Sequence, residues 1–217
     1  MTYDELKTAI GNWLNRSDLT SHYDTFIDNA EAEFNRNIRH RDMIKRSDAT
    51  ADAQYLTLPT DWLEAVNVKI TTGTYRPLFQ VSIETADVIR NAQDNISGAP
   101  SYFSIVDKTL ELIPTPSTSS TLELIYYSKI PALSSSNTTN WLSTSHPDIY
   151  LYGCLKHASV FLMEDERVPL FESSYLKALV DLEEANEKAK YSDGSLIKRV
   201  RTYGHKGRTK TYYASNS

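Results

Sequence analysis

The hydrophobic residues of this chain change their spacing twice along the sequence. Residues 2–14 and 21–38 carry apolar side chains at intervals of three and four, which places them on one face of a helix. From about Tyr55 the apolar residues alternate or form β-branched runs broken by proline and glycine, which favours strands. Helical spacing returns after Ser145 and continues to Lys190. The sequence therefore predicts two helices, a block of strands and two further helices.

The order of these elements predicts one helical core rather than two. Neither helix pair has enough apolar surface for an independent core, so we expect all four helices to pack together. The predicted fold class is α+β: a helical bundle formed by the N-terminal and C-terminal helix pairs, with an inserted antiparallel β-rich region and an extended C-terminal arm. The expected division is N-terminal helices 1–50, β-rich region 51–140, C-terminal helices 141–193 and arm 194–217.

Local signals place several elements more closely. Capping patterns at Thr2, Ser21 and Ser145 mark three expected helix starts. Trp13 lies on the apolar stripe of the first helix, so we expect it in the core, where replacement by alanine would cost about 3–5 kcal/mol. The single cysteine, Cys154, falls inside an apolar helical pattern, which indicates a buried side chain. The middle block predicts a short helix at 82–93, a hairpin turning at residues 107–108 and a strand at 121–130.

The charge of the chain is distributed unevenly. All 28 acidic residues and 17 of the 23 basic ones precede Gly194, so the body carries a net charge of about −11. The arm has six basic residues and no acidic one, and its tyrosines can stack on bases or enter pockets of another protein. Composition does not choose between those two uses. The candidate docking residues of the arm are Lys198, Arg199, Arg201, Tyr203, Lys206, Arg208, Lys210, Tyr212 and Tyr213.

A second basic segment lies at residues 36–46. Its cations can meet phosphates, or they can complement the dipole of a helix C-terminus, and both interpretations stay open. The candidate residues of this possible secondary patch are Arg36, Arg39, Arg41, Lys45 and Arg46.

No pattern of catalytic or metal-binding residues stands out. The five histidines lack the i, i+4 pairing of a helical metal site, and seven glycines leave little material for a phosphate-binding loop. We therefore expect no enzyme activity, no catalytic or metal-binding residue and no cofactor. The sequence also lacks a stretch of about 20 apolar residues, and its start is acidic rather than signal-like, so we expect a protein made in the cytoplasm without a membrane partner.

Several stretches together resemble the head-to-tail adaptor, or connector, proteins of tailed bacteriophages, of the short-tailed phage type. The resemblance covers about residues 2 to 190 and depends on the order and spacing of apolar positions rather than on one motif. The stretches are TYDELKTAIGNWLNRSDL, FIDNAEAEFNRNIRHRDM, LPTDWLEAVNV, APSYFSIVDKTLELIPTP, LELIYYSKIPAL, NWLSTSHPDIYLYGCLKHASVFLMEDER and YLKALVDLEEAN.

The resemblance implies a structural protein of the virion, located at the head-to-tail interface. Such adaptors form a dodecameric ring under the portal, extend the DNA channel and provide a platform for tail proteins. The implied partners are the portal protein, tail or nozzle proteins, neighbouring copies in the ring, and packaged DNA that passes without sequence-specific binding. The basic arm would then dock on an acidic portal surface. The alternative hypothesis is a nucleic-acid-binding module that uses the basic C-terminal tail.

Overall fold

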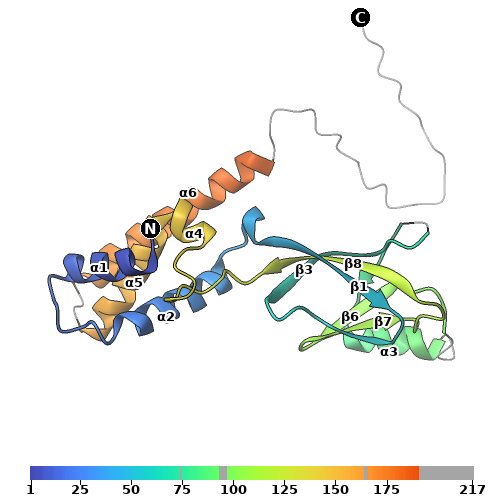
Figure 1. The fold of residues 1–217 in the computed structure, drawn as a ribbon. Coiled ribbons are helices and arrows are strands. Elements are labelled where there is room, and N and C mark those ends of the chain that lie inside the picture. Colours follow the sequence, from blue (N-terminus) through green and yellow to red (C-terminus); the bar gives the residue numbers. More distant parts are fainter. Residues whose placement is uncertain (74, 93–96, 164–165, 191–217) are drawn as a thin grey trace, which may run out of the picture.

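A computed structural model describes residues 1–73, 75–92, 97–163 and 166–190, and it confirms the α+β class. A helical body and a β-rich body lie side by side along an elongated molecule (Figure 1). The helices are α1 Tyr3–Leu14, α2 Tyr23–Asn37, α3 Ile83–Ala92, α4 Trp141–Ser145, α5 Pro147–Phe161 and α6 Val168–Lys190, with a 3-10 turn at Arg41–Met43. The strands are β1 Ile44–Ala51, β2 Tyr55–Thr57, β3 Trp62–Ile70, β4 Arg76–Pro77, β5 Phe79–Gln80, β6 Tyr102–Val106, β7 Thr109–Ile113 and β8 Ser120–Ser128.

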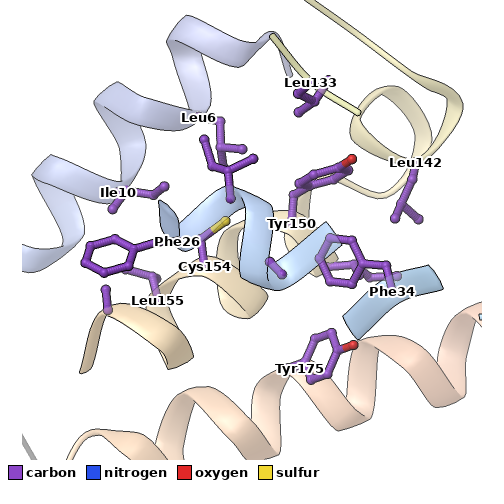
Figure 2. Close-up of a cluster of buried hydrophobic side chains, with 14 of the residues drawn as sticks. Leu6, Ile10, Phe26, Phe34, Leu133, Leu142, Tyr150, Cys154, Leu155 and Tyr175 are labelled. Carbon is purple, nitrogen blue, oxygen red and sulfur yellow. The ribbon is translucent and has the colours of Figure 1, made fainter. Parts of the chain in front are cut away.

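The helical body draws its core from both ends of the described chain. Helix α5 packs against α1, α2 and α6, so the N-terminal and C-terminal pairs form one bundle as expected. The predicted stripe of α2 is buried from Tyr23 to Ile38. Figure 2 shows α1, α2, α5 and α6 converging on one cluster of side chains, among them Leu6, Phe34, Tyr150 and Tyr175. The bundle therefore exists only when segments about 130 residues apart in sequence meet.

The contact between α2 and α5 depends on a glycine. A Cβ atom added to Gly153 would lie 2.9 Å from the ring of Phe34 and 3.5 Å from the Cβ of Ala30. The Phe34 ring also meets the ring of Tyr150 edge-on at 4.9 Å. Because the missing side chain leaves room for the Phe34 ring, the two helices approach closely at this point.

The capping predictions are confirmed at one helix and wrong at two. Thr2 and Glu5 form the expected capping box at α1. Helix α2 instead starts after His22 with no side-chain cap. Ser145 ends the short helix α4, which Asn140 caps, and α5 then begins at Pro147 without a side-chain cap. Asn140 caps α4 through its Oδ1, which accepts from the Ser143 amide at 2.8 Å, and its Nδ2 donates separately into the core, as described below.

Trp13 is not in the core, contrary to the sequence prediction. Its side chain is 50% exposed, whereas Leu6, Ile10 and Leu14 of the same helix are buried. The indole sits at the margin of the stripe, where its ring centre lies 6.0 Å from that of Tyr152 and 6.3 Å from that of Phe171, both in edge-on geometry. An apolar position at the edge of a helical stripe is thus covered on one side alone.

The β-rich body consists of two four-stranded sheets with a second hydrophobic core. The strand orders are β1-β8-β3-β4 and β2-β7-β6-β5, and all pairs are antiparallel except β5 with β6. The predicted hairpin is confirmed as β6 and β7, turning at Asp107 in the left-handed region with φ 53°. The expected strand at 121–130 is the central strand β8, and the helix expected at 82–93 is α3. The interior residues are Ala51, Leu58, Val68, Ile70, Leu78, Phe103, Leu110, Leu112, Leu122, Leu124 and Tyr126.

The β region starts earlier than the sequence indicates. Strand β1 begins at Ile44, well before Tyr55, and pairs with β8 from Ile44↔Tyr127 to Ala51↔Ser120. Its sequence, IKRSDATA, is polar and only Ala51 is buried, so no alternating pattern marks it. Pairing with β8 makes this segment a strand, which is a tertiary effect that local propensity does not contain.

Candidate assembly surfaces

The two bodies meet at a junction made of residues 38–43 and 129–140, and a buried carboxylate organises one side of it. Glu31 Oε1 accepts hydrogen bonds from the Leu133 amide at 2.7 Å and from the Tyr150 hydroxyl at 3.1 Å. The side-chain amide of Asn140 donates to Tyr150 Oη at 2.6 Å and to the Pro131 carbonyl at 2.7 Å. The loop that follows β8 is therefore fixed to α2 and α5.

Burying the polar side chains of the junction removes them from water, which costs free energy, and each of these side chains has a hydrogen-bond partner in the protein. Burial raises the pKa of Glu31, although the Leu133 amide and the Tyr150 hydroxyl oppose that shift. Burial, together with the nearby Glu31 charge, also raises the pKa of Tyr150. Because each buried polar group here has a partner, the arrangement holds one geometry instead of several.

A second set of bonds ties β8 and β3 to the segment after α2. The Ser128 hydroxyl donates to the Met43 carbonyl at 3.0 Å, and Arg39 Nε lies 3.1 Å from Glu64 Oε2 on β3. The Tyr126 hydroxyl donates to Asp61 at 2.9 Å, and burial followed by the Asp61 charge raises the pKa of Tyr126 to about 12. The junction thus positions the β-rich body relative to the bundle from both connecting segments.

The secondary basic patch spans three elements rather than one helix end. Arg36 is exposed in the last turn of α2, Arg39 and Arg41 lie near the 3-10 turn, and Lys45 and Arg46 are on β1. Four of the five residues make ion pairs with carboxylates. The pairs are Arg39 with Glu64, Arg41 with Asp42, Lys45 with Asp61 and Arg46 with Glu123. Much of the positive charge in this segment is therefore compensated within the protein.

A groove of about 670 Å³ runs between the C-terminal half of α6 and the junction. Leu176 and Val180 form one wall, and both are about half exposed, at 52% and 53%. Ile38 and Tyr127 contribute to the opposite wall. Asn186 closes one end, because its side chain accepts from the Arg41 amide at 3.3 Å and donates to the Arg39 carbonyl at 3.4 Å.

Sequence analysis did not predict this groove, although a signal was present. Phe171, Tyr175, Ala178 and Leu182 form the buried stripe of α6. The pair Leu176 and Val180 has the same i, i+4 spacing but lies off that stripe. A second apolar row on a helix that already has a buried row indicates a second contact surface.

Another apolar surface lies at the end of the bundle, around the turn between α5 and α6. Phe161 is 51% exposed and its ring lies 4.8 Å from His22 and 5.5 Å from Phe26. Val160, Met163 and Leu170 are also exposed there, as are Tyr55, Val66, Phe79 and Val106 on the β-rich body. Exposed apolar groups on both bodies indicate surfaces that contact other proteins.

Three titratable groups inside the bundle, Lys156, His157 and Cys154, are paired or buried. Lys156 Nζ lies 2.6 Å from Glu33 and 4.7 Å from the ring centre of Tyr175, and burial lowers the pKa of His157. Cys154 is buried as predicted, and burial raises the pKa of its thiol. Within the described ranges, no group of three or more His, Cys, Asp or Glu side chains is placed to hold a metal ion. In the same ranges, no helix is long and apolar enough to cross a bilayer.

The candidate docking residues of the arm, from Lys198 to Tyr213, lie outside the described residues. Their role is therefore still a prediction from sequence, and so is the division of the chain at 50, 140 and 193. The last described residue is Lys190, at the end of α6.

The bundle, the fixed junction and the exposed apolar surfaces are those of a structural protein that acts by contact with other proteins. The chain matches the SU10 adaptor protein family over residues 1–200, and it belongs to that family. It is therefore a phage adaptor, a structural component of the virion whose family implies contacts with portal and tail proteins. This confirms the resemblance drawn from the sequence, and the match also includes the first residues of the arm. A comparison with curated proteins found no match.

Proposed function

We propose that copies of this chain form a dodecameric ring under the portal, extend the DNA channel and present a platform to tail proteins. The family match over residues 1–200 carries this proposal. A closed ring needs two different contact surfaces on each copy, because head-to-tail interfaces join unlike faces. The apolar groups at the end of the bundle and on the β-rich body supply two such surfaces.

The charge of the body supports a channel role. Its net charge is about −11, given 28 acidic and 17 basic residues before Gly194. A channel wall rich in carboxylates repels the phosphates of the duplex, so DNA slides through it without sticking. Packaged DNA is therefore a passing partner in this proposal and is not recognised by sequence.

The basic arm supplies the contact to the portal in this proposal. Residues 194–217 hold six cations and three tyrosines, and those that reach an acidic partner gain charge-assisted hydrogen bonds and buried rings there. Ordering such a segment costs conformational entropy, which those contacts offset.

Truncation after Asp193 tests the arm directly. The expected result is loss of binding to the assembled portal protein while the body still folds and unfolds cooperatively, because the bundle core ends within α6. A variant with Lys206, Arg208 and Lys210 changed to glutamine is the matched control, and it should weaken binding without abolishing it. A truncated protein that binds the portal as tightly as the full chain would refute the docking role.

The nucleic-acid alternative predicts a different result from the same proteins. Binding of duplex DNA that falls steeply with salt and disappears on truncation would favour it. The paired state of Arg39, Lys45 and Arg46 weighs against this alternative, since these cations already face carboxylates.

A further inference from the structure

The groove beside α6 is half open, and its walls combine apolar and acidic groups. Leu176 and Val180 leave about half of their surface uncovered. Glu183 and Glu187 follow them along the same side of the helix and also line the groove. Within the described part of the chain, no ion pair joins the Glu183 carboxylate to another residue. An occupant of this groove should therefore carry apolar side chains and positive charge.

The chain itself contains such a segment directly after α6. Residues 196–201 read LIKRVR, which places Leu196, Ile197 and Val200 among three cations. Asp193 and Gly194 precede this segment, and an Asp-Gly pair favours a tight turn. Nothing else in the arm combines aliphatic side chains with cations in this way, since the residues from 202 onward contain no Leu, Ile or Val.

The reach of the chain also fits. Val180 lies ten residues before the end of α6, which is about 15 Å along a helix rising 1.5 Å per residue. An extended chain covers about 20 Å in six residues, so Val200 comes alongside Val180 when residues 191–194 form the turn itself and do not extend past the end of α6. Residues 203–213 then extend beyond the groove and stay available for a partner.

We propose that this groove is the docking site of the chain's own residues 196–201, which fold back antiparallel to α6. The aliphatic side chains of the segment cover Leu176 and Val180, and its cations face Glu183 and Glu187. This inference concerns the free protein and does not depend on the portal. The arm then has two parts. Residues 196–201 cover the groove of the chain's own body, and the residues after them carry the tyrosines Tyr203, Tyr212 and Tyr213.

A pair of engineered cysteines tests the docking in the free protein. The full-length variant carries Val180→Cys and Val200→Cys with Cys154→Ala, and the control carries Asp181→Cys and Val200→Cys in the same background. Asp181 is a matched control because it is exposed, lies one residue from Val180 along α6 and does not line the groove. Under mild oxidation at low protein concentration, the first variant should form an intramolecular disulfide about tenfold faster than the control, because docking raises the local thiol concentration.

A charge change sharpens the same experiment. Adding Glu183→Lys to the Val180→Cys variant should slow the crosslink several-fold, and adding Arg199→Glu as well should restore part of the rate. Equal rates for the Val180 and Asp181 pairs would overturn the proposal. Crosslinks found only between chains would also overturn it, because the groove would then hold the segment of a neighbouring copy. Neither result bears on portal binding, so failure here is distinguishable from failure of the proposed function.

Discussion

The hydrophobic core of the helical body is built from residues far apart in the sequence, whereas the core of the β-rich body is built from residues of one continuous region. The bundle core joins Leu6 near one end of the chain to Leu182 near the other, whereas the β core lies wholly within residues 51–126. The bundle therefore depends on long-range closure, and the β-rich body depends on neighbouring segments. The β-rich body is therefore an insertion between the helix pairs, and the bonds of Glu31, Tyr150 and Asn140 help to fix how the two bodies are arranged.

The largest expected effect comes from emptying the bundle core. Phe34→Ala removes a fully buried ring that fills the space left by Gly153 and contacts Tyr150. We expect a loss of about 3–5 kcal/mol in the free energy of unfolding, measured by chemical denaturation. Leu112→Ala in the β core is the matched comparison, with an expected loss of about 2–4 kcal/mol. If Phe34→Ala costs less than Leu112→Ala, the bundle is not the more demanding of the two cores.

The junction should show the next largest effect, and it should depend on pH. The pKa of Glu31 is raised above its ordinary value of 4.5 in the folded protein. The folded state therefore binds the proton more tightly than the unfolded state, so the free energy of unfolding falls as pH rises from about 4.5 through the raised pKa. Glu31→Gln should lack this decline, and Glu31→Ala should cost about 1–3 kcal/mol because the Leu133 amide and the Tyr150 hydroxyl lose their acceptor.

Denaturation curves of the wild type and of Glu31→Gln between pH 4 and pH 8 check this expectation. Asp24→Asn is a control, since its carboxylate is on the bundle surface and its pKa is lowered by Lys7. Parallel pH profiles for the wild type and Glu31→Gln would show that this carboxylate does not control the junction.

Trp13 tests the boundary of the bundle core. Because the indole is half exposed and its two ring contacts are edge-on, Trp13→Ala should cost about 1–2 kcal/mol. This is less than the loss of about 3–5 kcal/mol expected of a buried tryptophan. A measured loss as large as that of Phe34→Ala would place Trp13 in the core after all.

The smallest expected effect concerns the ion pair between the two bodies. Arg39 and Glu64 lie 3.1 Å apart with side-chain exposures of 34% and 61%. A double-mutant cycle with Arg39→Ala and Glu64→Ala should give a coupling of about 0.2–1 kcal/mol that weakens with salt. Coupling well above 1 kcal/mol would mean that charge, and not the buried Glu31 network, holds the junction.

The sequence predicts those parts of the fold that depend on residues close together in the chain. The stripe from Tyr23 to Ile38, the α1 capping box and the hairpin at Asp107 are all confirmed because short-range spacing or turn chemistry specifies them. Strand β1 was not predictable, since its polar sequence becomes a strand only by pairing with β8.

The candidate site was less predictable for a related reason. Leu176 and Val180 look like ordinary members of an amphipathic helix until the position of α5 shows that they lie off its buried face. The burial of Glu31 was likewise hidden, because its partners are the Leu133 amide in the loop that follows β8 and the Tyr150 hydroxyl on α5, both about 100 residues or more away in sequence. The exposure of Leu176 and Val180 and the burial of Glu31 depend on long-range contacts, and such contacts are not visible in a single sequence.

The central claim is that this adaptor forms a ring on the portal, and the mass of the complex tests it most directly. Native mass spectrometry of the full-length chain mixed with the assembled portal protein at moderate salt gives the number of copies bound. The account predicts one discrete species, a portal carrying a full ring of adaptor copies, with no such species for the chain truncated after Asp193. A portal that stays at its own mass, or that binds scattered numbers of copies, would contradict it.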